Sequence, residues 1–389
     1  MCQPDTIESL LAAVAAQAKS ELAPLVSAID QDGVFPAEYL RNLGALGGFD
    51  VSVPVQLGGH GFGLATQIAV INHVGNHCGS TAFLAWCQSS CAWYLQHAPN
   101  ASVRERYLEP VSRGMLFAGT GMSNTVKHLA GIEKMHLTAQ RDGDGYTVNG
   151  TLPWVSNVGE QHLVIVAASV EGEGYVMFAV HGSATGLSLH PCPAFSGLTG
   201  TRTLNLRFKD ARIPNANVLA HPNQFRSYMQ RIKAGFMLGQ TGMGFGVIEG
   251  SLKTIRESNV NNAHVNTYLD DQEDCLAASL NELKVQVAAV AEQAEAGNAP
   301  ILSALKLRAA VSELALQAAN SAVLHAGAKG YLMRHAAQRR LREAVFVAIV
   351  TPALKHLRKE IHDIEEAGAS LGDQTRRPSA STPLQTEAA

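Results

Sequence analysis

The hydrophobic pattern of this 389-residue chain changes its period twice, at about Phe117 and at about Phe225. Before Phe117, apolar residues recur at the i, i+3, i+4 spacing that is typical of helices. Between the two points they form short β-rich runs separated by Gly, Asp and Asn turns, and after Phe225 the helical period returns. No internal repeat is visible. The order predicts an α+β protein with three parts.

We therefore expect an N-terminal α-helical domain over residues 1–116, a small antiparallel β-domain over 117–222 and a C-terminal four-helix bundle over 223–367. The helices expected in the first domain cover residues 7–26, 36–46, 65–74 and 81–95. Those of the bundle cover 232–258, 270–296, 301–325 and 336–366. The expected strands cover 146–148, 163–166, 175–180, 187–190 and 204–208. Residues 368–389 are rich in Ser, Thr, Pro and charge, so we expect a disordered tail.

Composition narrows the classes of function. Apolar residues make up 46% of the chain and charged residues 16%, a balance typical of globular proteins. The formal charge of −3 gives no basic excess for nucleic acid or an anionic membrane. Residues 1–11 lack a basic signal-peptide start, and no apolar run reaches roughly 20 residues. We expect a cytoplasmic protein with no membrane insertion that acts on small molecules.

The six cysteines do not predict a metal site or a disulfide framework. Their positions are irregular, and Cys87 with Cys91 has no second pair to complete a zinc site. We expect core thiols and no metal.

Five short sequence motifs follow one another along the chain. They are VPVQLGG at 53–59, FAGT at 117–120, DGYTVNGT at 144–151 with WVSN at 154–157, FKDARIP at 208–214 with VL at 218–219, and GAKGY at 327–331 followed by Arg339 and by Arg342 with Glu343. Each motif is weak alone, but the ordered set resembles the acyl-CoA dehydrogenase superfamily of flavoproteins. The resemblance covers residues of about 30 to 360 and implies the same three-part fold.

The resemblance also implies flavin contacts in the β-domain. In that family the Trp-x-Ser/Thr-Asn strand lies beside the flavin ring, so Trp154 is expected to cover one face and Ser156 to hydrogen-bond the ring edge. Without the neighbouring motifs, a core aromatic of the β-domain for Trp154 and a turn residue for Ser156 would be the better explanation. Thr120 matches a threonine that touches the flavin pyrimidine. Ser123 either replaces a lost hydroxyl of the next family motif or serves only a turn.

A second set of contacts is implied across a subunit boundary. Gly327, Gly330 and Tyr331 match the Gly-rich loop that approaches the adenine end of a flavin held by a neighbouring subunit, and glycine suits such close approach. A helix C-cap is the alternative for Gly327. The resemblance thus implies FAD, with FMN as the alternative, and a homo-oligomer, either a dimer or a homotetramer.

The catalytic base of the family has no counterpart. Such enzymes abstract the α-proton of an acyl thioester with a Glu. The usual position falls on Thr351, and the alternative position, near the start of the first bundle helix, falls at about Ala234. Glu343 and Glu249 are the nearest acids in the sequence, and both are poor replacements. The family's pyrophosphate-binding Arg, in the loop expected after that helix, is replaced by about Asn261, so FAD binding is weakened or reduced flavin comes from a partner reductase.

Three functions remain open. The first is an FAD-dependent oxidoreductase of an acyl thioester or similar acyl substrate, with a relocated or absent base and a separate electron acceptor. The second is a reduced-flavin-dependent monooxygenase of the same fold, and the third is a non-redox lyase or binding protein. His128, His264 and His325 are candidate acids or bases because histidine titrates near neutral pH, although surface or capping roles explain them as well. Gln240 and Thr241 suit either an acyl carbonyl or helix packing. We assign no catalytic residue.

Overall fold

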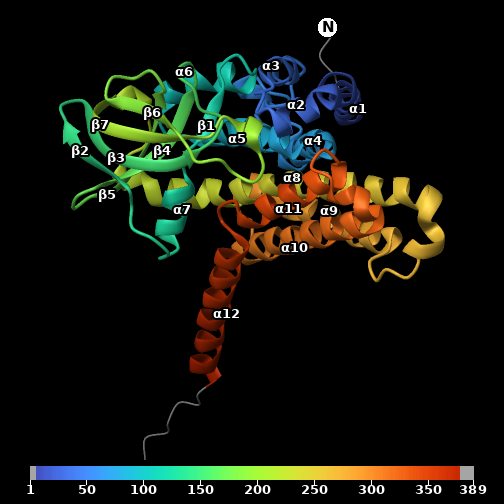
Figure 1. The fold of residues 1–389 in the computed structure, drawn as a ribbon. Helices are drawn as coiled ribbons and strands as arrows, with labels where there is room; N and C mark the ends of the chain where they lie inside the picture. The colour runs from blue at the N-terminus through green and yellow to red at the C-terminus, as the bar shows by residue number, and fades with distance from the viewer. Residues whose placement is uncertain (1–5, 377–389) are drawn as a thin grey trace, which may run out of the picture.

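The computed structural model describes residues 6–376, with side chains up to residue 367. Figure 1 shows a sheet at one end of the molecule, the N-terminal helices beside it, and a bundle of long helices below both. The predicted order of helical, strand and helical parts is confirmed.

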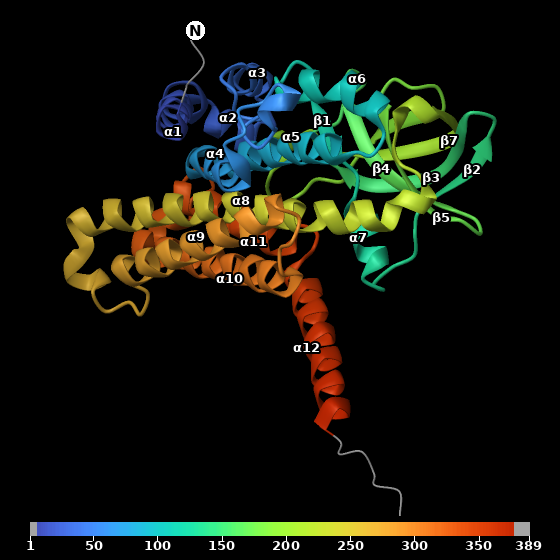
Figure 2. The same ribbon diagram turned by 180° about the vertical axis from the view of Figure 1, so that it is seen from behind.

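The N-terminal helices are α1 (Ile7–Gln17), α2 (Val26–Gln31), α3 (Ala37–Ala45), α4 (Gly63–His77), α5 (Gly79–His97) and α6 (Ala101–Ser112). The helix expected over 7–26 is present but subdivided, because α1 gives way to a π-helical segment (Ala18–Leu22) and a 3-10 segment (Ala23–Leu25) before α2. Residues 79–96 of α5 are all buried, since this helix lies between its neighbours α4 and α6, the sheet and the bundle. Figure 2 shows this central position from behind.

The central part is one eight-stranded sheet in the order β6-β7-β3-β2-β4-β5-β8, with β1 paired to β4. Its strands are β1 (Ala118–Thr120), β2 (Leu137–Asp142), β3 (Gly145–Val155), β4 (Leu163–Val170), β5 (Gly174–His181), β6 (Leu187–Pro191), β7 (Leu204–Pro214) and β8 (Val218–Ala220). All five predicted strands are present. The sheet is not wholly antiparallel, because β1 and β2 each run parallel to β4. The short helix α7 (Ser123–Leu129) follows β1 directly.

The bundle consists of α8 (Pro222–Asn266), α9 (Glu273–Glu295), α10 (Ile301–Ala326) and α11 (Ala336–Ile349). Helix α8 begins ten residues before the predicted start, with Pro222 in its first turn. It packs closely on α4, where a Cβ at Gly246 would lie 2.4 Å from Gly75 Cα. Residues 259–264, which we expected in a loop, belong to the last turns of α8.

The last predicted helix is divided in two at Thr351 and Pro352, where neither residue is helical. Helix α12 (Leu354–Arg376) then runs away from the bundle in Figure 1. It continues past Gly368, so the tail does not begin there, and residues 377–389 lie outside the described part of the chain.

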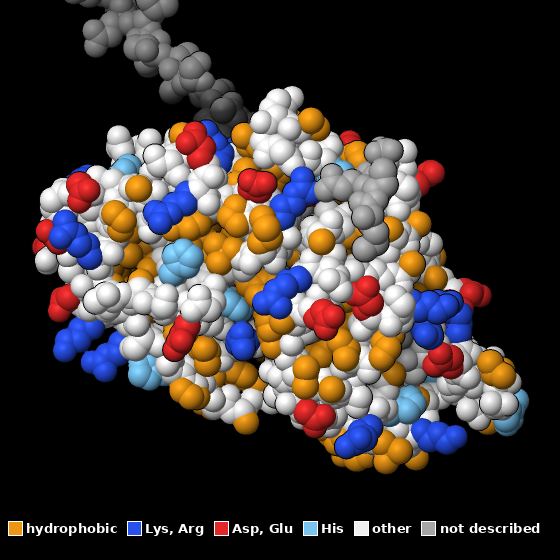
Figure 3. All heavy atoms as spheres, turned by 90° about the horizontal axis from the view of Figure 1, so that it is seen from above, with side chains coloured by type: hydrophobic (Ala, Val, Ile, Leu, Met, Phe, Trp, Pro, Cys, Tyr) orange, Lys and Arg blue, Asp and Glu red, His pale blue; other side chains and the backbone are white. Residues whose placement is uncertain are grey.

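Charged side chains of both signs are mixed with hydrophobic ones on the face that Figure 3 shows, so this face has no field of a single sign. Within residues 6–376, no helix combines the length and the apolar character that a membrane span requires.

Candidate functional site

Two hydroxyl groups meet where the sheet joins the bundle. Ser123 begins α7 immediately after β1, and its Oγ lies 2.7 Å from Oγ1 of Thr351 in the break between α11 and α12. Three residues before Ser123, at the end of β1, Thr120 Oγ1 lies 3.1 Å from the hydroxyl oxygen of Tyr94 on α5. The fold therefore brings the predicted residue Ser123 to the position where the resemblance places the base, while Thr120 contacts Tyr94.

Thr351 is held in place by a buried polar chain. Gln240 Nε2 on α8 donates to the Thr351 carbonyl oxygen at 2.8 Å, and Arg308 Nε on α10 donates to Gln240 Oε1 at 2.8 Å. The Arg308 guanidinium also donates to the Val347 carbonyl oxygen at 2.6 Å. Both the nitrogen and the oxygen of the Gln240 side-chain amide are thus engaged within the protein. Thr241 Oγ1 donates to the Leu238 carbonyl oxygen at 2.6 Å, so packing and not acyl recognition is the role that the contacts of both residues favour.

Arg308 is fully buried, and its partners are neutral groups. Desolvation by burial lowers the pKa of Arg308 to about 9. Sequence reasoning missed this residue. The available signal was its position on the predicted apolar stripe of residues 302–323, three residues after Leu305 and three before Val311.

The end of β3 carries the other β-domain candidates. The indole of Trp154 is 62% exposed and meets Phe195 edge-on at 6.0 Å between ring centroids. Ser156 is buried, and its Oγ lies 2.6 Å from Thr203 Oγ1. Trp154 has a φ of +57°, a left-handed conformation that is uncommon outside glycine and found often at functional sites.

The strands β1 and β3 are tied together beside these residues. Asn157 Nδ2 donates to the Ala118 carbonyl oxygen at 2.9 Å. At Gly119 a Cβ would lie 2.4 Å from the Ser156 carbonyl oxygen, so only glycine permits this approach. The segments that carry Thr120 and Ser156 are therefore in direct contact. An exposed indole beside hydroxyl groups fits the face and the edge of a flavin ring.

A narrow apolar pocket adjoins this site. It is lined mainly by Tyr94 of α5, Met122 before α7, and Ile232, Lys233, Phe236 and Met237 of α8. The space open to the centre of a water molecule is about 10 Å³, which is room for one water. A larger, shallow hollow of about 620 Å³ lies at the start of α8, beside the Arg141–Glu173 ion pair, and none of the predicted residues lines it.

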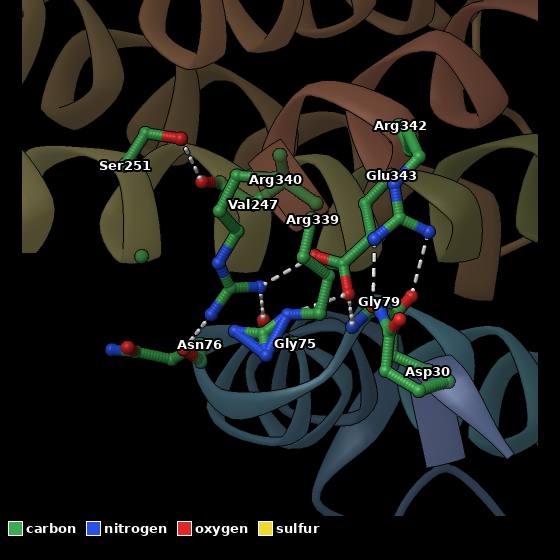
Figure 4. A network of polar contacts seen from close by, with 12 residues as sticks. Asp30, Gly75, Asn76, Gly79, Val247, Ser251, Arg339, Arg340, Arg342 and Glu343 are labelled. Carbon is green, nitrogen blue, oxygen red and sulfur yellow. Dashed lines mark hydrogen bonds and ion pairs between the residues drawn. The ribbon is translucent and has the colours of Figure 1, made fainter. Parts of the chain in front are cut away.

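Figure 4 shows why Glu343 is a poor substitute for the missing base. Its Oε1 accepts from the Gly79 N–H at the start of α5 at 2.9 Å, and its Oε2 accepts from Arg340 at 2.8 Å. Arg342 forms a two-pronged ion pair with Asp30 in the same network, at 2.8 and 2.6 Å. These contacts fix α11 on the N-terminal helices.

Glu249 is engaged as well. It accepts from Asn76 at 3.0 Å and pairs with Lys284. Ala234, the alternative position for the base, is buried and apolar.

The three histidines of the sequence analysis lie elsewhere. His128 uses both ring nitrogens, toward the Tyr175 hydroxyl at 2.8 Å and the Glu133 carbonyl oxygen at 3.0 Å. His264 is exposed near the end of α8, and His325 is buried near the end of α10. None of them lines the apolar pocket. Among the described residues, no three His, Cys, Asp or Glu side chains are grouped as metal ligands.

Gly327, Gly330 and Tyr331 lie at the other end of the bundle. They form a 3-10 turn (Gly327–Tyr331) after α10, beside Ser258 of α8, whose Oγ donates to the His325 carbonyl oxygen. Ser258 is 18 residues beyond Gln240 on α8, which corresponds to about 27 Å at a rise of 1.5 Å per residue. Tyr331 is 82% exposed. Within one chain this turn is therefore far from Gln240 and from Thr351, which Gln240 contacts.

Comparison with known proteins gives a consistent result. The family model "Acyl-CoA dehydrogenase, N-terminal domain" matches residues 4–115. The probable acyl-CoA dehydrogenase YngJ of Bacillus subtilis is 25% identical over 346 residues, which cover 85% of this chain and 90% of YngJ. The human mitochondrial short-chain specific acyl-CoA dehydrogenase is 27% identical over 257 residues, and the match spans 64% of this chain and 61% of the human protein. The structure of butyryl-CoA dehydrogenase from Megasphaera elsdenii superposes with a TM-score of 0.82 at 19% identity, over 95% of this chain and 99% of that one.

Proposed function

Because the chain belongs to the acyl-CoA dehydrogenase superfamily, we propose that it is an FAD-dependent oxidoreductase that acts on an acyl thioester or a similar acyl substrate, without the usual Glu base. The observation that carries the proposal is the contact of Ser123 with Thr351, together with the contact of Thr120 with Tyr94, which lines the apolar pocket. The bound flavin supplies a hydride acceptor.

We assign each site residue a proposed role from its position. Trp154 would cover the flavin, and the hydroxyls of Ser156 and Thr120 would hydrogen-bond its edge. The apolar pocket would exclude water from an acyl group. Ser123 and Thr351 would supply neutral hydroxyls where a carboxylate is expected, and a neutral hydroxyl is a much weaker base.

That same hydroxyl pair favours a second candidate, a reduced-flavin-dependent monooxygenase. Such a reaction starts from reduced flavin and O2, so it needs no base for an acyl α-proton. In this case the proposed protein partner is a flavin reductase.

We also propose that the site is completed in a homo-oligomer, by Gly327, Gly330 and Tyr331 of a second copy. The distance of about 27 Å along α8 supports this, since it separates Gln240, which contacts Thr351, from Ser258 beside the turn of the same chain.

The test is the visible spectrum of the purified protein, followed by anaerobic mixing with a panel of acyl-CoAs. A yellow protein that is bleached by an acyl-CoA supports the oxidoreductase. If the protein is not bleached but takes up O2 when an NADH-dependent flavin reductase is added, the monooxygenase is supported. A protein that stays colourless after incubation with FAD and with FMN would contradict both and favour the non-redox class.

A further inference from the structure

The hydroxyl group of Ser156 is the first member of a chain of hydroxyl groups that ends on a backbone carbonyl group. Ser156 Oγ lies 2.6 Å from Thr203 Oγ1, and Thr203 Oγ1 lies 2.8 Å from Thr201 Oγ1. Thr201 Oγ1 donates to the Leu198 carbonyl oxygen at 2.7 Å. These distances are those of O–H···O hydrogen bonds, so one proton lies between each pair of oxygen atoms.

The carbonyl group fixes the direction of every bond in this chain. A carbonyl oxygen only accepts, and a hydroxyl group has one proton to donate, so the Thr201 proton is committed to Leu198. Thr203 must then donate to Thr201, and Ser156 must donate to Thr203. Toward any further partner, the Ser156 hydroxyl oxygen can therefore only accept a hydrogen bond.

The backbone holds the chain of hydroxyl groups in this arrangement. The Asn157 N–H donates to the Thr201 carbonyl oxygen at 3.0 Å, which ties the segment after Ser156 to the segment that carries both threonines. The two segments also contain residues with left-handed φ values of +48° to +60°, namely Trp154, Asn157, Leu198 and Arg202. Such conformations persist only where the surrounding contacts determine them, so the Ser156 hydroxyl group has a fixed setting.

The other hydroxyl pairs of the candidate site differ in this respect. In the Thr120–Tyr94 pair and in the Ser123–Thr351 pair, either oxygen can be the donor. Their protons can therefore be redirected toward a ligand, whereas the proton of Ser156 is committed.

A flavin changes what its N5 atom offers when it is reduced. Oxidised N5 carries a lone pair and only accepts, whereas reduction by two electrons adds a proton at N5 and makes it a donor. A hydroxyl oxygen that only accepts pairs with the reduced ring, but it turns a lone pair toward the oxidised ring.

We propose that Thr201 and Thr203 are positioning residues that fix the Ser156 hydroxyl group as an acceptor toward flavin N5, so that the site favours reduced over oxidised flavin. The proposal rests on the proposed function, because it concerns the flavin edge that Ser156 is proposed to contact. A site of this kind raises the midpoint potential of the bound flavin. It also suits a protein that takes up reduced flavin from a reductase.

The test is the midpoint potential of the FAD-loaded full-length protein, from anaerobic titration against a redox dye, together with the Kd for oxidised FAD from calorimetry. Thr203→Val removes the acceptor of the Ser156 proton, which can then bond oxidised N5. We expect this variant to bind oxidised FAD about tenfold more tightly, since a hydrogen bond replaces two opposed lone pairs. A tenfold change corresponds to a midpoint potential about 30 mV lower for a two-electron couple. Ser156→Ala should also lower the potential, but by weakening the binding of reduced FAD.

Three further variants separate the direction of the hydrogen bond from the packing of the segment. Thr203→Ser keeps the hydroxyl group and should keep the natural potential. Thr199→Val is the matched control, because Thr199 Oγ1 donates to the Asp30 carbonyl oxygen at 2.8 Å, outside the chain of hydroxyl groups, and its loss should leave the potential unchanged. Thr201→Val interrupts the chain one step later, so it should lower the potential as Thr203→Val does and replaces that variant if it does not fold.

The outcomes are distinct. If Thr203→Val or Thr201→Val is folded by circular dichroism and keeps the natural potential, the proposal is overturned and the proposed flavin function stands. If Thr199→Val or Thr203→Ser lowers the potential as much as Thr203→Val does, packing of the segment sets the potential, and the proposal is overturned as well. If the natural protein binds neither oxidised nor dithionite-reduced FAD or FMN, the proposed flavin-dependent function fails, and this proposal fails with it.

Discussion

Ser123 Oγ and Thr351 Oγ1 lie 2.7 Å apart, although 228 residues separate them in the chain. The pair joins the first residue of α7 to the break that follows α11, and Gln240 fixes the Thr351 carbonyl group from the opposite side. The position where the resemblance places a Glu base is thus an ordered part of the structure. It holds a hydroxyl group that is bound to a second hydroxyl group.

The first prediction concerns proton abstraction. Straight-chain acyl-CoAs should reduce the bound flavin very slowly, since a positioned general base contributes roughly 10²- to 10⁴-fold to the rate. Thr351→Glu alone should raise the rate of flavin reduction only slightly, because Pro352 restricts the backbone at that position. Thr351→Glu with Pro352→Gly should raise the rate of flavin reduction more than the single change, as measured by anaerobic stopped-flow absorbance. Rapid reduction of the unmodified protein by an ordinary acyl-CoA would show that a base lies elsewhere.

The second prediction concerns the flavin contacts. Trp154→Ala should lower flavin occupancy, because loss of a stacked indole costs about 1 kcal/mol or more. Ser156→Ala should shift the flavin midpoint potential. Trp154 is 62% exposed, so its variant should stay folded, and flavin content is measured after gel filtration. Thr138→Ala, an exposed residue of β2 away from the site, serves as the control. Unchanged flavin content and potential in both test variants would refute the assignment.

The third prediction separates a structural Glu343 from a catalytic one. Glu343→Gln leaves the buried Arg340 without its carboxylate partner, so the free energy of unfolding should fall by about 3–5 kcal/mol. Glu313→Gln removes a carboxylate from an exposed ion pair with Arg358 and should cost about 1 kcal/mol or less. Urea unfolding at pH 7 measures both. A Glu343→Gln protein of natural stability that has lost its activity would indicate a catalytic role instead.

The sequence predicted the three-part order because the period of the apolar residues changes at Phe117 and at Phe225, and such periodicity is a local property. It missed β1, β2 and β8. Strands β1 and β8 are each three residues long, and so short a strand has no detectable alternation, while β2 has only Leu137 and Ala139 as apolar residues. It also placed the start of α8 ten residues too late, because Phe225, Tyr228 and Met229 are the only large apolar residues in the otherwise polar stretch 222–231. Burial against the sheet and the N-terminal helices, and not local pattern, decides these boundaries.

The site was predicted less completely than the fold. The resemblance identified Thr120 and Ser123, whose position beside β1 the structure shows. It gave no indication of the partner hydroxyl groups on Tyr94 and Thr351, because contacts between residues so far apart in sequence leave no local signal. Arg308 differs from these residues, because its long-range contacts did leave a local signal. A charged residue on an apolar stripe indicates a buried polar contact, and this signal was available in the sequence.

The fourth prediction concerns pH. Burial, together with the positive charge of Arg231, lowers the pKa of His97 to about 3, and its ring packs edge-on against Trp93 at 4.3 Å. The unfolded chain binds a proton at this residue below its ordinary pKa of about 6.5, whereas the folded protein does not. The stabilisation is therefore complete above pH 6.5 and is lost as the pH falls from there toward 3.

The measurement is the free energy of unfolding at pH 7 and at pH 5, from urea titrations of the natural protein and of His97→Gln. The natural protein should lose up to about 1.4 kcal/mol more per pH unit over this interval than the variant does. The other histidines are the same in both proteins, so the difference isolates His97. Equal losses would show that His97 titrates alike in the folded and the unfolded chain.

The fifth prediction tests whether two chains share each flavin site. The protein should be a dimer or a tetramer by light scattering at micromolar concentration. Trp154→Ala and Tyr331→Asp should each lower flavin content while leaving the fold intact, because both side chains are largely exposed. When the two variants are co-expressed, a site that takes Trp154 from one chain and Tyr331 from another is intact in roughly a quarter of random pairings. Flavin content should then rise above that of either variant alone. A monomer, or mixed oligomers that bind no more flavin than the separate variants, would show that the turn at Gly327–Tyr331 does not complete the site of a neighbour.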